Sequence, residues 1–142
     1  MGMYALSVVP IIKGTNTKEL SQIWYADDGT GVGKLQRLRE WWDRLAEQGP
    51  KYGYHTNARK TILVTKPQHE LEARRIFETT GIQVVTSGTR HLGAALGSKD
   101  FAAEYVKRKV EKWCLEMKTL TTFAQTEPQA AYSAFVFGFK GK

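Results

Sequence analysis

The chain has 142 residues, 42% hydrophobic and 25% charged, which suits one domain with a core and excludes both a disordered acidic chain and a fibrous repeat. Lysine and arginine outnumber aspartate and glutamate by 21 to 14, and the net charge of +7 is compatible with polyanion binding and equally with a lysine-rich solvated surface. No apolar run is long enough to span a membrane, and the single cysteine excludes an internal disulfide, so we expect an intracellular protein of the cytoplasm or nucleus without a membrane partner.

The first part of the sequence alternates between helical and strand patterns. Residues 3–12 are almost all apolar and predict a short helix that stops near Pro10. Residues 20–26 predict a strand, because they include β-branched and aromatic side chains. The aspartates and glycines of 27–31 predict a turn, since both residue types tolerate positive φ. An amphipathic helix is expected over 33–48, where apolar residues recur at helical spacing: Leu35, Leu38, Trp41, Trp42 and Leu45.

The alternation continues in the middle of the chain. Residues 60–65 alternate apolar and polar side chains, as a half-buried strand does. A helix is expected over 67–80, with a proline at its start and a glycine just after its end. Residues 82–86 predict another strand, and 91–96 predict a short one interrupted by Gly93.

Two helices are expected at the end of the chain. Ser98 suits the N-cap of the longer one, in which apolar residues follow at three- and four-residue steps: Ala102, Val106, Val110, Trp113, Met117, Leu120 and Ala124. Residues 126–128 predict the start of a last helix, which runs to 138. With sheet elements first and helices last, the fold class we expect is α+β.

Asp27 and Asp28 are the residues whose chemistry stands out. Adjacent carboxylates raise each other's pKa unless a cation lies beside them. A divalent metal removes that penalty, and ligation by oxygen alone fits Mg²⁺ or Mn²⁺. The alternative, an exposed Asp-Asp-Gly turn without a ligand, is about as well supported by the residues alone.

The order of several short motifs resembles the palm of reverse transcriptases, the RNA-directed DNA polymerases. Tyr25-Ala26-Asp27-Asp28, after an apolar strand, resembles their catalytic hairpin. The segment 53–61, a glycine followed by Asn-x-x-Lys, resembles their next palm motif, and 91–97 is similar to the hairpin called the primer grip. The basic helix after it stands where the thumb begins, and residues 1–13 resemble the helix that follows the family's Gln-Gly motif. The pattern is like that of reverse transcriptases of mobile genetic elements in animal genomes.

The resemblance implies a particular arrangement of the chain. Residues 1–97 would be a ferredoxin-like palm remnant, from the Asp-Asp hairpin to the primer-grip hairpin, and 98–142 would be the helical start of the thumb. In such a palm, residues 20–26 form a central strand, and the helices 33–48 and 67–80 lie on one face of the sheet.

The resemblance also implies roles for individual residues. Asp27 and Asp28 would hold Mg²⁺ or Mn²⁺ weakly, with affinity of millimolar order, because an ion with two protein ligands keeps most of its water. Lys60 would act as a general acid near the departing pyrophosphate; the alternative is an exposed lysine at the start of a strand. Contacts with an RNA or DNA template–primer would come from Tyr25, Ala26, Leu92 and Gly93. For Leu92 and Gly93, the alternative is an ordinary bend in a strand.

Basic residues of the long helix are further candidates for nucleic-acid contact: Lys107, Arg108, Lys109 and Lys112. They alternate with glutamates, so solvated pairs at i and i+4 are the alternative explanation.

The departures from the family limit the function that we expect. Nucleotidyl transfer in this family needs a third carboxylate upstream of the hairpin, and the only acid before Tyr25 is Glu19. The fingers and the Gln-Gly motif are also absent. We therefore expect a fragment, cut at both ends, that is inactive as a polymerase by itself. The alternatives are a non-catalytic nucleic-acid- or protein-binding module, and a fragment that self-associates through apolar surface such as residues 1–12.

Other chemistry-bearing residues give weaker signals. His55, His69 and His91 lack the spacing of metal ligands. The glycines of 29–33 resemble a phosphate loop only superficially, because the lysine and hydroxyl of a P-loop are missing. Trp41 and Trp42 could stack on bases, but their helical spacing predicts that at least one belongs to the core.

Overall fold

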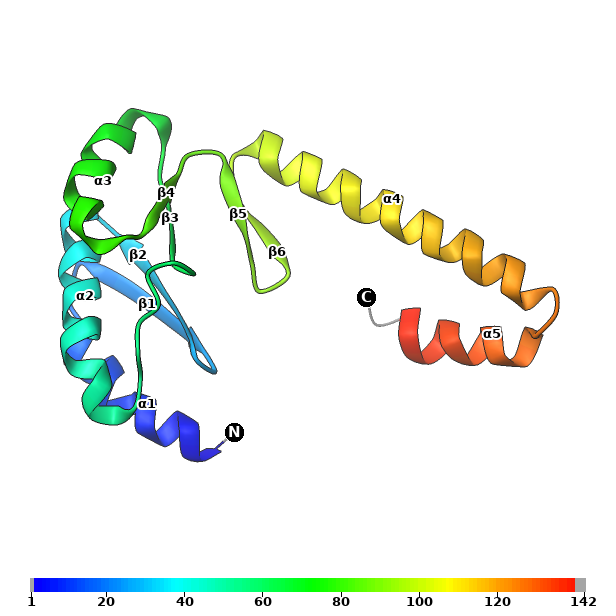
Figure 1. Cartoon of the computed structure of the whole chain (residues 1–142), viewed down its shortest axis with the longest axis horizontal. Helices are drawn as coiled ribbons and strands as arrows, with labels where there is room; N and C mark the ends of the chain where they lie inside the picture. Colours follow the sequence, from blue (N-terminus) through cyan, green and yellow to red (C-terminus); the bar gives the residue numbers. More distant parts are fainter. Residues whose placement is uncertain (1, 140–142) are drawn as a thin grey trace. The chain divides into compact units, whose positions relative to one another are not determined.

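The computed structural model describes residues 2–139. The chain divides into two compact units, one ending at Thr86 and the other beginning at Ser87 (Figure 1). The described residues of the first unit combine helices with two two-stranded sheets, and those of the second unit combine helices with one, which confirms the α+β class. The expected boundary between palm and thumb, at 97/98, falls inside the second unit.

The first unit contains three α-helices and four strands, joined by short 3-10 turns. In chain order they are α1 (Gly2–Thr15), β1 (Leu20–Tyr25), β2 (Asp28–Gly33), α2 (Leu35–Gln48), β3 (Ile62–Val64), α3 (Glu70–Phe77) and β4 (Gln83–Val85). The 3-10 turns are η1 (Gly49–Tyr52), η2 (Pro67–His69) and η3 (Glu78–Thr80).

Helix α1 is longer than expected. It continues past Pro10 to Thr15, although a proline inside a helix removes one backbone hydrogen bond. The carbonyl that is left free is that of Leu6, which is exposed, so water can solvate it. Val8, Ile11 and Thr15 are buried in the unit, and their burial holds the helix in place.

The core of the first unit lies between α1, β1 and α2. Ile11, Leu20, Trp41 and Leu45 form one buried cluster, and Trp24, Leu38 and Tyr54 pack against it. The helical spacing of α2 therefore predicted its inner face correctly. Trp41 is a core residue, as expected for at least one of the two tryptophans.

The glycine-rich segment after Asp28 was expected to be a turn, and that prediction is wrong. It forms strand β2, which pairs antiparallel with β1. The glycines leave room for indole rings: a Cβ on Gly31 would lie 2.9 Å from Cζ3 of Trp41, and one on Gly29 would lie 3.0 Å from the ring of Trp24. These glycines therefore serve the packing of tryptophans.

Strands β3 and β4 pair parallel, with Leu63 opposite Val84. Strand β1 hydrogen-bonds to β2 and, within residues 2–139, to no further named strand. It is thus one half of a two-stranded hairpin, and the central position expected for residues 20–26 is not seen.

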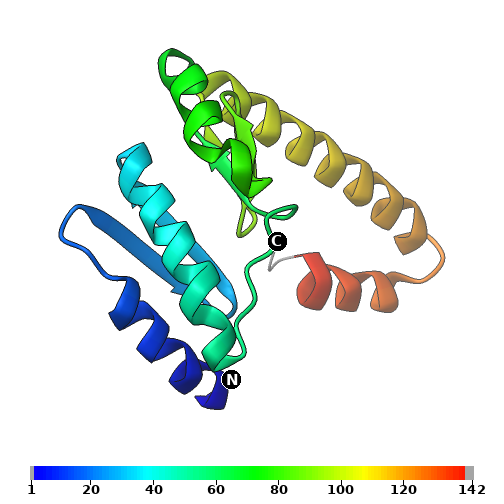
Figure 2. The same cartoon turned by 60° about the vertical axis from the view of Figure 1, so that its left-hand side comes forward.

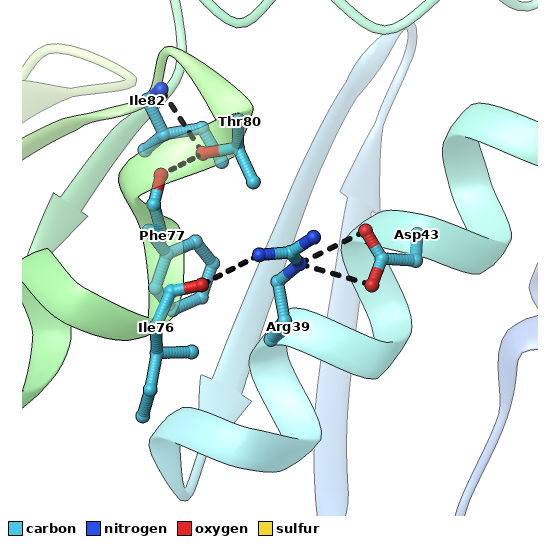
Figure 3. A network of polar contacts seen from close by, with 6 residues as sticks. All are labelled: Arg39, Asp43, Ile76, Phe77, Thr80 and Ile82. Carbon is cyan, nitrogen blue, oxygen red and sulfur yellow. Dashed lines mark hydrogen bonds and ion pairs between the residues drawn. The ribbon is translucent and has the colours of Figure 1, made fainter.

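Helices α2 and α3 lie side by side. They were expected on one face of a single sheet, and the described strands of this unit form two separate two-stranded sheets instead. In Figure 1 both lie to the left of the strands of this unit, and Figure 2 shows them in front. Arg39 of α2 donates from Nη1 to the carbonyl oxygen of Ile76, near the end of α3 (Figure 3). Its Nε donates to both carboxylate oxygens of Asp43, each at 2.9 Å, which orients the guanidinium. A cation at this helix end also interacts favourably with the helix dipole.

The second unit consists of a hairpin and helices: β5 (Gly88–His91), β6 (Ala94–Gly97), α4 (Lys99–Ala124), α5 (Pro128–Ala134) and a π-helical turn, η4 (Phe135–Phe139). Ser98 caps α4, as expected, because its Oγ accepts a hydrogen bond from the backbone nitrogen of Phe101 at 3.2 Å. Within residues 2–139, no helix is both long and apolar enough to cross a membrane.

Candidate metal and nucleic-acid site

The first candidate site is the turn that joins β1 and β2. Tyr25 pairs with Asp28, so Ala26 and Asp27 form a two-residue turn. Ala26 has a φ of 51°, at a position where hairpins of this length favour glycine. A residue with a Cβ in this region is strained by about 1–2 kcal/mol. The motif therefore occupies a strained turn at the tip of a hairpin.

The two carboxylates of this turn are available to a ligand, because Asp27 and Asp28 are both exposed. Among residues 2–139, no group of three or more His, Cys, Asp or Glu side chains could hold a metal ion. The turn thus offers at most two carboxylates. Such a pair fits a hydrated Mg²⁺ or Mn²⁺ ion that keeps most of its water, and not an enclosed metal centre.

Lys60 lies in a turn before β3. Its backbone nitrogen donates to the carbonyl oxygen of Asn57 at 3.1 Å and lies 3.3 Å from Asn57 Oδ1. The strand expected to begin at residue 60 begins at Ile62, because this turn occupies the residues before it. The Lys60 side chain is exposed.

A second turn, formed by Leu92 and Gly93, joins β5 and β6. The residue pattern predicted one interrupted strand here, which is wrong, whereas the resemblance implied a hairpin, and the segment is a hairpin. Both turn residues have positive φ, 46° for Leu92 and 84° for Gly93, as in the turns that two-residue hairpins favour. A Cβ on Gly93 would meet nothing within 4 Å of the chain itself, so within the chain this glycine supplies the backbone conformation. Leucine with positive φ is strained, as Ala26 is.

The base of the second hairpin does need glycine for close approach. Gly88 pairs with Gly97, and a Cβ on Gly97 would lie 2.4 Å from the Cα of Gly88. A Cβ on Gly88 would lie 2.7 Å from the ring of Phe101, at the start of α4. The glycines therefore let the hairpin begin directly against the helix.

Tyr105 connects the tip of this hairpin to α4. Its hydroxyl donates to the carbonyl oxygen of Gly93 at 2.7 Å. Lys109 Nζ lies 6.0 Å from the centroid of the Tyr105 ring, within reach of a cation–π interaction. Sequence analysis missed Tyr105, because no local pattern links a tyrosine on a helix to a turn before it.

The basic residues of α4 do not all share one side of the helix. At 3.6 residues per turn, Arg108, Lys109 and Lys112 lie on the same side as Tyr105, and Lys107 lies on the opposite side. Two of the four have carboxylate neighbours at i and i+4: Arg108 lies 3.5 Å from Glu104, and Lys112 lies 3.8 Å from Glu116. Exposed pairs of this kind are weak and leave the cations able to exchange partners.

Most of the predicted site residues thus form two groups, to which Lys60 and Lys107 do not belong. Tyr25, Ala26, Asp27 and Asp28 share one hairpin tip in the first unit. The second unit brings Leu92 and Gly93 together with three of the four cations, through Tyr105. Comparison of the chain with protein-family models, curated proteins and solved structures found no match in any of the three.

Proposed function

We propose that this chain is a palm-to-thumb fragment of the reverse transcriptase of a mobile genetic element, and that it binds a divalent cation weakly and nucleic acid through backbone phosphates. The observation that carries the proposal is the exposed Asp27-Asp28 pair at the strained tip of the β1–β2 hairpin. Strained backbone is concentrated at functional sites, where surrounding structure maintains it.

The finer fold belongs to the same proposal. A ferredoxin-like palm would have α2 and α3 on a single face of one sheet, whereas in the described residues the β1–β2 hairpin and the β3–β4 pair are separate two-stranded sheets. The side-by-side placement of these helices supports that arrangement. The second hairpin and the basic helix α4 follow in the order that the family's primer grip and thumb would have.

Asp27 and Asp28 would hold the ion, and Lys60 would donate a proton to the leaving group. Bound Mg²⁺ or Mn²⁺ supplies Lewis-acid polarisation of phosphate oxygens. Polymerisation needs one more carboxylate beside these two. Glu19 does not fit that role: it precedes β1 while Asp27 follows it, and a six-residue strand spans about 20 Å. Glu19 is also paired with Arg37, at 2.6 Å. We therefore expect no polymerase activity from this chain alone.

Nucleic acid would bind to the side of α4 that carries Arg108, Lys109 and Lys112. Lysine and arginine neutralise phosphates and release counterions, so the affinity falls with salt. Such contacts carry no base information, so sequence preference should be absent. The Leu92-Gly93 turn on the same side would contact the same strand.

The test of the cation site uses Mn²⁺ as a paramagnetic probe. Amide NMR signals of residues 25–29 should broaden at millimolar Mn²⁺ in the wild type, and Asp27→Asn with Asp28→Asn should abolish the effect. The paired variant Glu104→Gln with Glu111→Gln removes two exposed acids elsewhere and should leave it unchanged. Equal broadening at every exposed acid would overturn the cation site.

The test of the nucleic-acid surface compares two double variants of α4. Lys109→Ala with Lys112→Ala removes two cations from the proposed side, and Lys107→Ala with Lys118→Ala removes two from the other side. At 50 mM salt, the first should weaken binding of a duplex by about tenfold or more, and the second by much less. Equal effects, or no binding at all, would contradict this surface.

A second candidate function is a non-catalytic nucleic-acid-binding module. The observation that favours it is that the hairpin tip supplies only two carboxylates. Primer extension with Mn²⁺ separates the two functions. Nucleotide incorporation that disappears in Asp27→Ala would establish a polymerase and rule out the non-catalytic module.

A further inference from the structure

The β1–β2 hairpin has an apolar side that faces away from the core. Its inner side carries Leu20, Gln22 and Trp24, which point toward α2. On the other side, Ile23 and Tyr25 are each 65% exposed, and Val32 is 62% exposed. We call Ile23, Tyr25 and Val32 the outer hairpin face.

This composition is unusual for the solvent side of a hairpin. Antiparallel strands with one buried side normally alternate apolar and polar residues, so that the solvent side is polar. Here the cross-strand register groups three large apolar side chains: Val32 is opposite Ser21, Ile23 is opposite Thr30, and Tyr25 is opposite Asp28. Contiguous exposed apolar surface of this kind marks an interaction site.

The two ends of the outer hairpin face carry opposite charge. Asp27 and Asp28 lie at the tip, and Lys18 and Lys34 flank the other end, with all four side chains exposed. The carboxylate of Glu19 at that end is paired with Arg37, so the end keeps a net positive charge. The ends are about 20 Å apart, the length of a six-residue strand. Such a surface has an apolar centre, one acidic end and one basic end. It is complementary to a second copy whose hairpin runs in the opposite direction, because each acidic end then meets a basic end.

We propose that the outer hairpin face binds a second copy of this chain through a two-fold axis. With the axis near Ile23, the two Ile23 side chains meet at the centre, and Tyr25 of each copy lies over Val32 of the other. The acidic tip of each hairpin then lies beside Lys34 of the other. This is the isologous contact that a two-fold axis requires, with two sheets packed face to face. Nucleic acid fits the face less well when no cation is bound, because the acidic tip then repels phosphates.

The area limits the affinity of the pair. Three large side chains per copy give less than the roughly 800 Å² per partner of a standard interface, so the dimer should be weak. Sedimentation velocity from about 10 µM to about 1 mM covers the dissociation constants expected for it. EDTA in the buffer keeps the measurement independent of the proposed cation site.

The first set of variants tests the apolar centre. Ile23→Asp should weaken dimerisation at least tenfold, because it places a charge at the axis. Leu71→Asp is the matched control, since Leu71 is 86% exposed on α3 and lies outside the face. Circular dichroism checks that each variant folds, and Val32→Ser replaces Ile23→Asp if that variant does not. Dimerisation that is lost in Leu71→Asp but kept in Ile23→Asp would overturn the proposal.

The second set tests the orientation by exchanging charges. Asp27→Lys alone and Lys34→Glu alone should each weaken the dimer, because each places like charges together. The double variant should restore most of the affinity, since each copy then carries both reversals. A double variant weaker than both single variants would overturn the two-fold arrangement. A chain that stays monomeric at the highest concentration, and whose outer hairpin face is protected only by an added oligonucleotide, would establish nucleic acid as the occupant instead.

Discussion

The indole nitrogen of Trp41 donates a hydrogen bond to Oε1 of Gln22 at 3.1 Å, and this contact joins α2 to β1. The same oxygen accepts a hydrogen bond from Trp24 Nε1 at 3.0 Å and lies 3.2 Å from Thr15 Oγ1. The amide nitrogen of Gln22 donates to the carbonyl oxygen of Ile12 at 2.9 Å. One polar side chain thus links α1, β1 and α2, within the core that supports the Asp27-Asp28 hairpin.

We expect Gln22→Leu to lower the free energy of unfolding by about 2–4 kcal/mol, because it leaves two indole donors without their acceptor and removes the shorter of two contacts to the carbonyl oxygen of Ile12. Urea unfolding followed by tryptophan fluorescence measures the change. Gln36→Leu, at an exposed position of α2, is the control and should change stability little. Equal losses in both variants would contradict the role of the Gln22 contacts.

We expect Gly31→Ala to destabilise the first unit by about 1–3 kcal/mol. The new methyl group would lie 2.9 Å from the Trp41 ring and 3.1 Å from Cδ2 of Leu38, so the core must move. Ser21→Ala changes the exposed side of the paired strand and serves as the control. Thermal unfolding of both variants gives the comparison; an unchanged midpoint for Gly31→Ala would show that the indole has room to shift.

We expect Ala26→Gly to raise the stability of the hairpin by up to about 1 kcal/mol, since glycine adopts positive φ without strain. The control is the same substitution at a helical position, where the change in stability should be in the opposite direction. Ala103→Gly, inside α4, should lower stability by about 1 kcal/mol. Chemical unfolding monitored by NMR reports on each unit separately. A loss of stability in Ala26→Gly would mean that the turn is not strained.

We expect Tyr105→Phe to loosen the second hairpin, because the carbonyl oxygen of Gly93 loses its donor at 2.7 Å. A hydrogen bond of this kind contributes about 1 kcal/mol, so amide exchange in 88–97 should accelerate several-fold. Tyr132→Phe, on an exposed position of α5, removes a hydroxyl without that contact and should leave the exchange unchanged. If the amides of residues 88–97 exchange at the same rate in Tyr105→Phe and in the wild type, the Tyr105 hydroxyl does not hold the turn.

We expect Arg37→Ala to raise the pKa of Glu19 toward its usual value. The hydrogen bond from Arg37, and then its positive charge, hold the pKa of Glu19 below that value. A lowered carboxyl pKa stabilises the folded state above the pKa of the unfolded chain, and this stabilisation is lost as the pH falls through the folded pKa. An NMR titration of the Glu19 carboxyl carbon measures the shift, with Arg44→Ala as the control. A Glu19 titration that is identical in all three proteins would contradict the pairing.

Patterns that depend on neighbouring residues predicted much of the secondary structure. The helical spacing of apolar residues placed α2 and put the buried Leu45 and Trp41 on its apolar side, although it did not decide between Trp41 and Trp42. Ser98 marked the start of α4 through its own hydroxyl. These features could be predicted because a helix is stabilised by contacts within a few residues, which the sequence displays directly.

Strand β2 could not be predicted in the same way. Its glycines favour a turn by intrinsic preference. They lie in a strand, where the rings of Trp24 and Trp41 pack against the positions that Cβ atoms would occupy. The same reason explains why Tyr105 was missed: its partner, Gly93, lies twelve residues earlier, beyond β6. In both places, a contact between distant residues outweighs local preference.

The sequence by itself therefore determined the α+β class, most of the helices and the position of the Asp27-Asp28 motif, because these follow from local spacing and composition. Only the tertiary structure decided that the motif occupies a strained two-residue turn, that Tyr105 holds the Leu92-Gly93 turn, and that Ile23, Tyr25 and Val32 face away from the core. The physical reason is that exposure, strand register and backbone strain depend on which segments pack together. No single segment contains that information.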